Sequence, residues 1–249
     1  MELFGNGLLY LPNAFGISLG SIEGDGQVEL GDFVLTVGSN NLSTVFGGVI
    51  KDEVSEGGAG TLKKVGSGAL TLSSKNIYGG GTVVLEGTLI LASEIASATG
   101  AGPVDVKGGT LSGTGTIFGA VTVGTGSGSG AILDPGNGTT PGTLTIQNHL
   151  IFHDDATCTV LLNSDTPASD QVTAKGIRIR NASILFQDGG TALLPPGTTF
   201  TIINNIGARR IKGTFTNLPD GSIITIGSNN FQASYSGSDG NDLTLTVVL

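Results

Sequence analysis

The sequence predicts an all-β chain wound as a parallel β-solenoid, and three observations carry this prediction. Of the 249 residues, 43 are glycine and only 11 are basic and 20 acidic, which is about twice the usual glycine and half the usual charge. Short runs of alternating apolar and polar residues recur between turn residues, which is typical of half-buried strands. A Gly-Thr-apolar unit returns along the chain, which indicates a repeat architecture.

The composition excludes three other classes of chain. Glycine costs roughly 1 kcal/mol relative to alanine inside a helix, so a helical protein is disfavoured. A hydrophobic fraction of 38% and a mean hydropathy of +0.25 are too apolar for a disordered chain. Collagen needs glycine at every third position, and neither that spacing nor more than 8 prolines is present.

The repeat unit sets the expected size of one coil. Its copies are Gly60-Thr61-Leu62, Gly87-Thr88-Leu89, Gly109-Thr110-Leu111, Gly142-Thr143-Leu144 and Gly213-Thr214-Phe215. Successive copies are 27, 22, 33 and 71 residues apart, and the last gap is close to three steps of about 24. A unit of roughly 22–27 residues with occasional insertions fits these gaps.

Strands of three to six residues supply the walls of each coil. They are expected at Val34–Val37, Ala69–Leu72, Thr82–Leu85, Leu89–Leu91, Val121–Val123, Leu144–Ile146 and Leu243–Val247. Three such strands and three turns fill one coil, so the sequence predicts about 10 coils stacked into a rod about 50 Å long. A β-sandwich also has short, regularly spaced strands, but it does not require near-identical Gly-Thr-Leu units.

Charge and cysteine content limit the partners of the chain. The formal net charge is −9 and the isoelectric point is about 4.5, which argues against nucleic acid because phosphates require a basic surface. No apolar run approaches the roughly 18 residues of a membrane span, so no membrane insertion is expected. The single cysteine, Cys158, excludes an internal disulfide.

Two segments carry a family resemblance. Residues 20–50 contain Gly20-Ser21-Ile22-Glu23-Gly24-Asp25-Gly26 and Leu35-Thr36-Val37-Gly38-Ser39-Asn40-Asn41. Residues 60–89 read Gly-Thr-Leu-Lys-Lys-Val-Gly-Ser-Gly-Ala-Leu-Thr-Leu and continue to Gly87-Thr88-Leu89. The second segment resembles the autotransporter-associated β-strand repeat, and the first resembles the passenger domains of bacterial autotransporters. Lys64, Ser74 and Lys75 depart from the usual pattern of that repeat.

The resemblance implies a right-handed parallel β-helix exposed at a bacterial surface or secreted. We expect a single domain over residues 1–249, with an N-terminal edge or cap at 1–15, the best repeat match at 16–92, and further coils and a C-terminal end at 93–249. The N-terminus lacks a basic segment followed by an apolar one. The signal peptide and the anchor or barrel that such proteins carry are therefore expected outside this chain.

Acidic residues are the first candidates for chemistry. His149, His153, Asp154 and Asp155 lie close together in sequence, and Asp134 precedes them by about one coil. On a β-helix such residues can meet across coils as a metal site or as a carboxylate pair for glycoside cleavage. The chain has only two histidines, so we favour a solvated turn and predict no catalytic, cofactor or metal residues.

Two further patterns have a site interpretation. The turn Gly237-Ser238-Asp239-Gly240-Asn241-Asp242-Leu243 resembles one calcium-binding nonapeptide, although such sites use two successive copies. Six of the eleven basic residues gather in one stretch of the chain: Lys175, Arg178, Arg180, Arg209, Arg210 and Lys212. If their strands stack, they form a basic stripe able to hold a carboxylate or sulfate of a surface glycan. A polar turn and scattered solvated charges are the favoured alternatives.

Three functional hypotheses remain open at this point. The first is a non-enzymatic structural or adhesive segment of a surface protein, with a host or matrix protein or glycan as its partner and no cofactor. The second is a carbohydrate-active enzyme, a polysaccharide lyase or glycosidase, because such enzymes share the β-helix fold. The third is a fibre module that associates head to tail through uncapped solenoid ends.

Overall fold

Alternating burial along short strands builds the molecule. The computed structural model describes residues 1–249 except 12–15, 53–58, 94–95 and 129; residues 12–15 of the predicted N-terminal edge therefore lie outside the described residues. In strands such as Thr61–Lys64, Ala69–Leu72 and Thr88–Leu91, intermediate and buried residues alternate. Period-two burial directs one side chain inward and the next outward.

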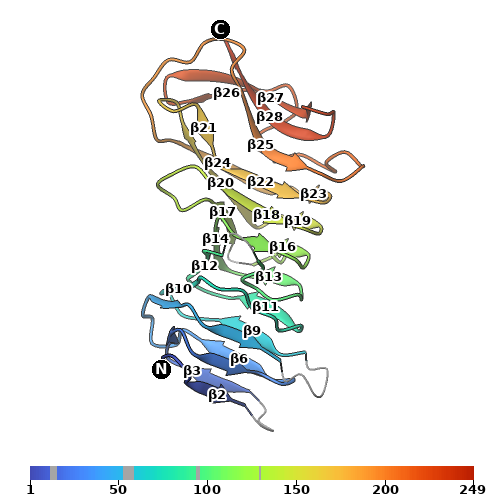
Figure 1. Cartoon of the computed structure of the whole chain (residues 1–249). Coiled ribbons are helices and arrows are strands. Elements are labelled where there is room, and N and C mark those ends of the chain that lie inside the picture. Colours follow the sequence, from blue (N-terminus) through green and yellow to red (C-terminus); the bar gives the residue numbers. More distant parts are fainter. Residues whose placement is uncertain (12–15, 53–58, 94–95, 129) are drawn as a thin grey trace.

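Three parallel sheets form the walls of the solenoid, and Figure 1 shows their strands stacked along one axis. The first sheet contains β1 (Glu2–Leu3), β4 (Glu23–Gly24), β7 (Thr44–Phe46), β10 (Ala69–Leu72), β12 (Thr88–Leu91), β14 (Gly109–Gly113), β17 (Ala131–Pro135), β20 (Ala156–Asn163) and β24 (Ser183–Asp188). The second contains β3 (Ile17–Leu19), β6 (Val34–Val37), β9 (Thr61–Lys64), β11 (Gly81–Val84), β13 (Val104–Val106), β16 (Val121–Val123), β19 (Leu150–Phe152) and β23 (Ile177–Ile179). Successive strands of one sheet are separated in sequence by strands of the other sheets, which is the connectivity of a β-solenoid.

The third wall is built from two groups of strands. The first group is β2 (Leu8–Tyr10), β5 (Gln27–Glu29) and β8 (Val49–Lys51), and the second is β15 (Thr116–Ile117), β18 (Thr143–Ile146), β22 (Gln171–Ala174) and β25 (Thr199–Asn205). Single parallel bridges, Lys51 to Ile77 and Ser97 to Thr116, extend the two groups toward each other. Buried Asn76 lies between them: it accepts the Ile50 N–H at 2.7 Å and donates to the Ala98 carbonyl at 2.6 Å.

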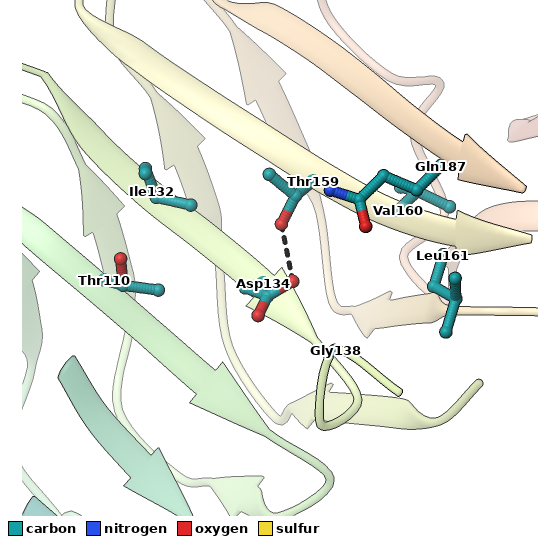
Figure 2. A pocket seen from close by; sticks show the side chains of 8 residues that line it. All are labelled: Thr110, Ile132, Asp134, Gly138, Thr159, Val160, Leu161 and Gln187. Atoms are coloured by element: carbon teal, nitrogen blue, oxygen red, sulfur yellow. Dashed lines mark hydrogen bonds between the residues drawn. The ribbon is translucent and has the colours of Figure 1, made fainter. Parts of the chain in front are cut away.

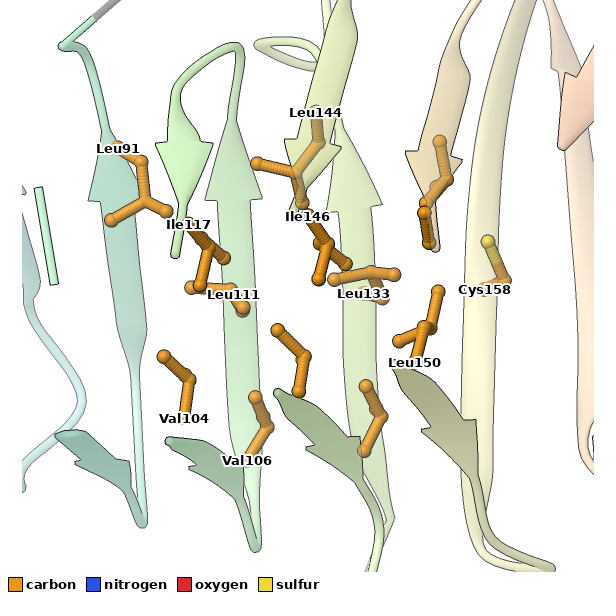
Figure 3. Close-up of a cluster of buried hydrophobic side chains, with 14 of the residues drawn as sticks. Leu91, Val104, Val106, Leu111, Ile117, Leu133, Leu144, Ile146, Leu150 and Cys158 are labelled. Atoms are coloured by element: carbon orange, nitrogen blue, oxygen red, sulfur yellow. The ribbon is translucent and has the colours of Figure 1, made fainter. Parts of the chain in front are cut away.

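Register between coils agrees with the predicted repeat length of 22–27 residues in three of four successive pairs of the first sheet, and the remaining pair is shorter. In the first sheet, Leu70 pairs with Leu89, Leu89 with Leu111, and Leu111 with Leu133, at separations of 19, 22 and 22 residues. Leu133 then pairs with Cys158, 25 residues later. These in-register residues are buried, so identical positions of neighbouring coils form columns of apolar side chains (Figure 3). One continuous cluster of buried residues runs from Leu3 to Val247.

Buried Lys64 lies at one corner of the solenoid, beside a column of glycines from successive coils: Gly38, Gly66 and Gly87. Lys64 is 1% exposed, and its ammonium donates to the carbonyls of Val65, Gly66 and Glu86 at 2.7, 2.8 and 3.2 Å. Burial lowers the pKa of Lys64, while the charge of Glu86 acts in the opposite direction. The lysine that departs from the repeat pattern therefore satisfies three carbonyls of two coils.

The C-terminal end differs from the predicted series of coils. After β25 the chain forms β26 (Ile223–Ile226), β27 (Asn229–Gly237) and β28 (Asp242–Val248), and β25, β28, β27 and β26 pair antiparallel in that order. The Gly-Thr-apolar unit at Gly213 does not form a strand. Phe215 makes an isolated antiparallel bridge to Leu218, and its ring centroid lies 5.4 Å from that of Phe152. Antiparallel strands joined by a hairpin form backbone hydrogen bonds with each other. They therefore cover the end of the apolar column without requiring a further coil.

Candidate functional site: the basic groove and the carboxylate network

The acidic candidates do not come together. Asp134 lies on β17 in the first sheet, whereas Asp155 lies in the turn between β19 and β20. His153 is beside the glycine loop that contains Gly126, and His149 lies beside Gly176 in the neighbouring coil. Within the described ranges no cluster of three or more His, Cys, Asp or Glu side chains is able to hold a metal ion.

Asp155 binds the backbone of the preceding coil. Its two carboxylate oxygens accept N–H groups of Thr125 at 2.9 Å, Gly126 at 2.7 Å and Gly128 at 2.8 Å. Partial burial alone raises the pKa of this carboxyl, but the backbone hydrogen bonds outweigh it and lower the pKa to about 2. The side chain therefore stays ionised and acts as a clamp on a glycine-rich loop.

Asp134 belongs to a second network, shown in Figure 2. It accepts a hydrogen bond from the Thr159 hydroxyl at 2.5 Å and one from the Ser112 hydroxyl at 3.2 Å. It borders a hollow of about 320 Å³ that Thr110, Ile132, Gly138 and other residues of β14, β17 and β20 line. Asp134 is the single carboxylate among the described residues of this lining.

Asp170 is a carboxylate on which the charge of Asp134 acts, and the sequence pattern gave no sign of this pair. Asp170 is fully buried and accepts the N–H groups of Leu161 and Gly142, both at 2.8 Å. Burial is the main cause that raises the pKa of Asp170 to about 6. The hydrogen bonds from the two N–H groups lower this pKa, and the charge of Asp134 raises it. A glycosidase needs two carboxyl groups open to the sugar, and Asp170 does not reach the hollow. Asp170 therefore supports the backbone, whereas Asp134 accepts hydrogen bonds from two side-chain hydroxyls.

The turn that resembles a calcium motif is engaged in local contacts. Asp242 is buried and its Oδ1 accepts the Asn205 N–H at 2.8 Å, while Asn241 Nδ2 donates to the Gly207 carbonyl at 2.8 Å. Buried Asn205 in turn donates from Nδ2 to the Arg209 carbonyl at 2.6 Å. These contacts fix the loop that follows β25.

That loop brings most of the predicted basic stripe together. Two adjoining hollows of about 670 and 400 Å³ share His149, Gly176 and Arg209 in their linings. Together they form what we call the basic groove, whose cationic residues are Lys175, Arg178, Arg209, Arg210 and Lys212. All five are exposed. Arg180, the sixth predicted member, follows the end of β23 and is not in either lining.

Strand register explains why these cations meet. Ile151, Arg178 and Lys212 occupy matching positions of three successive coils, because β19 pairs with β23 and Arg178 bridges to Lys212. The Lys212 N–H donates to the Ile177 carbonyl at 3.0 Å, and the Ile179 N–H donates to the Lys212 carbonyl at 2.8 Å. The separation of 34 residues between Arg178 and Lys212 exceeds the repeat length, so spacing alone did not identify the pair.

These observations define the class of protein: a β-solenoid whose parallel strands pair coil by coil. Residues 62–91 match the family model described as the passenger-associated-transport-repeat. The chain therefore carries an autotransporter passenger repeat, and the resemblance predicted from the sequence is confirmed.

One relative extends the match beyond the repeat. Over 131 residues the chain is 38% identical to the protein named adhesin BmaC autotransporter of Brucella suis biovar 1 (strain 1330). The aligned region covers 49% of this chain and 4% of that adhesin. The chain thus corresponds to a small part of its relative's length.

Proposed function

We propose that this chain is a non-enzymatic adhesive segment of a bacterial surface or secreted protein. The observation that carries the proposal is the continuous parallel ladder, which satisfies the backbone internally and leaves only outward side chains for a partner. Similarity to an autotransporter adhesin supports the same role. Contact with a host or matrix surface would then depend on the outer faces of the rod.

Several finer features belong to this proposal. The continuous core supports one domain over residues 1–249, and crossover connections between parallel strands are right-handed in nearly all proteins. We therefore propose a right-handed solenoid of about 10 coils, counting the C-terminal end. We propose that this segment is displayed at the cell surface or secreted, as its similarity to an autotransporter adhesin supports.

The carbohydrate-active alternative has less support. The hollow beside Asp134 presents one carboxylate, and the second carboxylate, Asp170, is fully buried with both oxygens bonded to the backbone. The fibre alternative rests on the strand edges of β1, β2 and β3, which end their sheets. Sizing chromatography over a concentration series distinguishes a fibre module from a monomeric segment.

Bead adhesion tests the proposed function directly. Beads carrying the full chain are expected to attach to host cells or to immobilised extracellular matrix more than beads carrying an unrelated β-solenoid. Attachment equal to that control on every surface would overturn the adhesive role. Release of unsaturated sugars or new reducing ends from uronate-rich polysaccharides would favour the enzyme instead.

The described part of the chain contains no helix long and apolar enough to cross a bilayer.

A further inference from the structure

We propose that the basic groove binds the acidic groups, sulfate or carboxylate, of a polysaccharide. This inference rests on the proposed adhesive function and names the chemistry of its partner. It is carried by four properties of the groove: opposed like charges, a described lining without a carboxylate, a fixed loop, and two stacked glycines in the lining.

Opposed like charges are the first property. Arg178 and Lys212 are bridge partners on adjacent coils, and both side chains are exposed on the outer face. Neighbouring strands are about 4.8 Å apart, and like charges directly opposite each other destabilise a sheet. An anion that contacts both side chains removes that repulsion, so the pair favours a bound anionic group over an empty surface.

The composition of the lining is the second property. Among the described residues that line the two hollows, His149, Lys175, Arg178, Arg209, Arg210 and Lys212 are the titratable ones, and none is a carboxylate. The ion pair recorded for the described residues, Lys51 with Glu29, lies on another wall of the solenoid. Among the described residues, the cations of the groove therefore have no carboxylate partner, although the whole chain carries a net charge of −9.

A fixed loop is the third property. Arg209 and Arg210 are exposed, but the backbone between them and β25 is held by buried Asn205 and by Asn241. Asn205 is itself anchored, since its N–H donates to buried Asp242. Binding then costs little ordering of the backbone, and a preorganised site gains affinity for that reason.

The shape of the groove is the fourth property. Gly176 and Gly207 stack in adjacent coils, and an added methyl group at Gly207 would come within 3.0 Å of the Gly176 nitrogen. Neither glycine adds a side chain to the lining, and the His149 imidazole lies beside Gly176. Two joined hollows with separate cationic groups suit a polymer that carries repeated anions better than one small ion.

Polysaccharide is favoured over nucleic acid by the same lining. Single-stranded nucleic acid is held by aromatic side chains that stack on successive bases, and the described lining of the groove contains no Phe, Tyr or Trp, with His149 as its one imidazole. A duplex needs a broad basic surface, whereas the chain is acidic outside this groove. Bidentate contacts from arginine suit sulfate and carboxylate groups on a sugar.

The test measures binding of defined polyanions to the full chain. The probes are a heparin oligosaccharide, which carries sulfate, hyaluronan, which carries only carboxylate, and duplex DNA. We expect the intact chain to bind at least one polysaccharide, with affinity that falls as salt rises. Arg178→Thr with Lys212→Thr, and separately Arg209→Ser with Arg210→Ser, should weaken that binding about tenfold or more.

The control variant removes the same charge elsewhere on the second sheet. Lys63→Thr with Lys107→Thr changes one residue of β9 and one exposed residue that follows β13, and we expect its affinity to stay within about twofold of the intact chain. Equal weakening in the control, no binding of either polysaccharide, or tighter binding of DNA would overturn the proposal. Because heparin carries carboxylate as well as sulfate, binding of hyaluronan would show that carboxylate suffices, and binding of heparin alone would show that sulfate is required.

Bead adhesion of the same variants separates this inference from the proposed function. Polysaccharide binding without any attachment to cells or matrix would overturn the adhesive role and leave the groove intact as an anion site. Attachment that persists in both groove variants, together with absent polysaccharide binding, would overturn the groove and leave adhesion to another surface.

Discussion

Aspartate carboxylates in this protein mainly bind backbone N–H groups of turns and neighbouring coils. Nine aspartates do so: Asp25, Asp32, Asp52, Asp155, Asp165, Asp170, Asp188, Asp220 and Asp242. Glycine-rich corners leave N–H groups without a strand partner, and an ionised carboxylate accepts several of them strongly. Acidic residues that suggest catalysis in the sequence therefore serve as corner caps in the structure.

Asp155→Ala tests the capping role. We expect the free energy of unfolding at pH 7 to fall by about 1 kcal/mol, because three N–H groups lose their acceptor at a partly exposed site. Since folding lowers the pKa of Asp155 to about 2, this stabilisation is present above pH 4 and is lost as the pH falls toward 2. Urea unfolding at pH 7 and pH 3 measures both effects.

Asp154→Ala is the matched control for that variant. Its side chain is exposed and only accepts a 3.4 Å hydrogen bond from Asn181. A loss of stability as large as that of Asp155→Ala would contradict the clamp.

Asp170→Asn tests a pH dependence of opposite sign. Folding raises the pKa of Asp170 to about 6, so the folded chain holds this proton more tightly than the unfolded chain. The contribution of Asp170 to stability is therefore greatest below pH 4 and declines as the pH rises to 6, by up to roughly 3 kcal/mol. The intact chain should lose stability relative to Asp170→Asn over that window in urea titrations. A constant difference between the two proteins from pH 4 to 7 would show that Asp170 does not titrate there.

At the scale of elements, strand positions and the parallel pairing of the coils were predictable, but the antiparallel pairing of the C-terminal strands was not. The alternating segments at Val34, Ala69 and Val121 begin strands β6, β10 and β16 as expected. The alternating segment from Leu243 is also a strand, but β28 pairs antiparallel with β25 and β27. Burial of alternate side chains is the same in both pairings, so the pattern cannot distinguish a coil from a terminal hairpin.

Corner glycines give a prediction at the same scale. Gly87 has a φ of +64°, and a methyl group added there would overlap the Gly66 carbonyl of the adjacent coil. Gly87→Ala is expected to lower the free energy of unfolding by more than about 2 kcal/mol. Gly221→Ala, at a φ of +76° with open space around it, should cost only about 1 kcal/mol. Equal losses of unfolding free energy in the two variants, measured by thermal or urea unfolding, would contradict this prediction. They would mean that the close contact with the adjacent coil adds nothing to the strain of a positive φ at alanine.

At the scale of the whole molecule, stability depends on contacts between adjacent coils. Deleting residues 88–109 joins Gly87 to Thr110, and Thr110 is the partner of Thr88 in the ladder. Because the solenoid is quasi-one-dimensional, we expect this variant to fold with an all-β far-UV circular dichroism spectrum and a modestly lower urea midpoint. Deleting residues 88–98 removes half of that length and shifts every later inward position, so this variant should not fold cooperatively. Failure of the first variant together with folding of the second would refute coil-wise stacking.

The sequence by itself determined the all-β class, the repeat length and the passenger-like character of the chain, because glycine, threonine and period-two alternation are local signals. Tertiary structure decided what the charged residues do. Whether Arg178 meets Lys212, and whether Asp170 lies beside Asp134, depends on register between coils whose length varies with each insertion. Local patterns carry no information about that register, so the basic groove and the capping carboxylates emerged only when the coils were stacked.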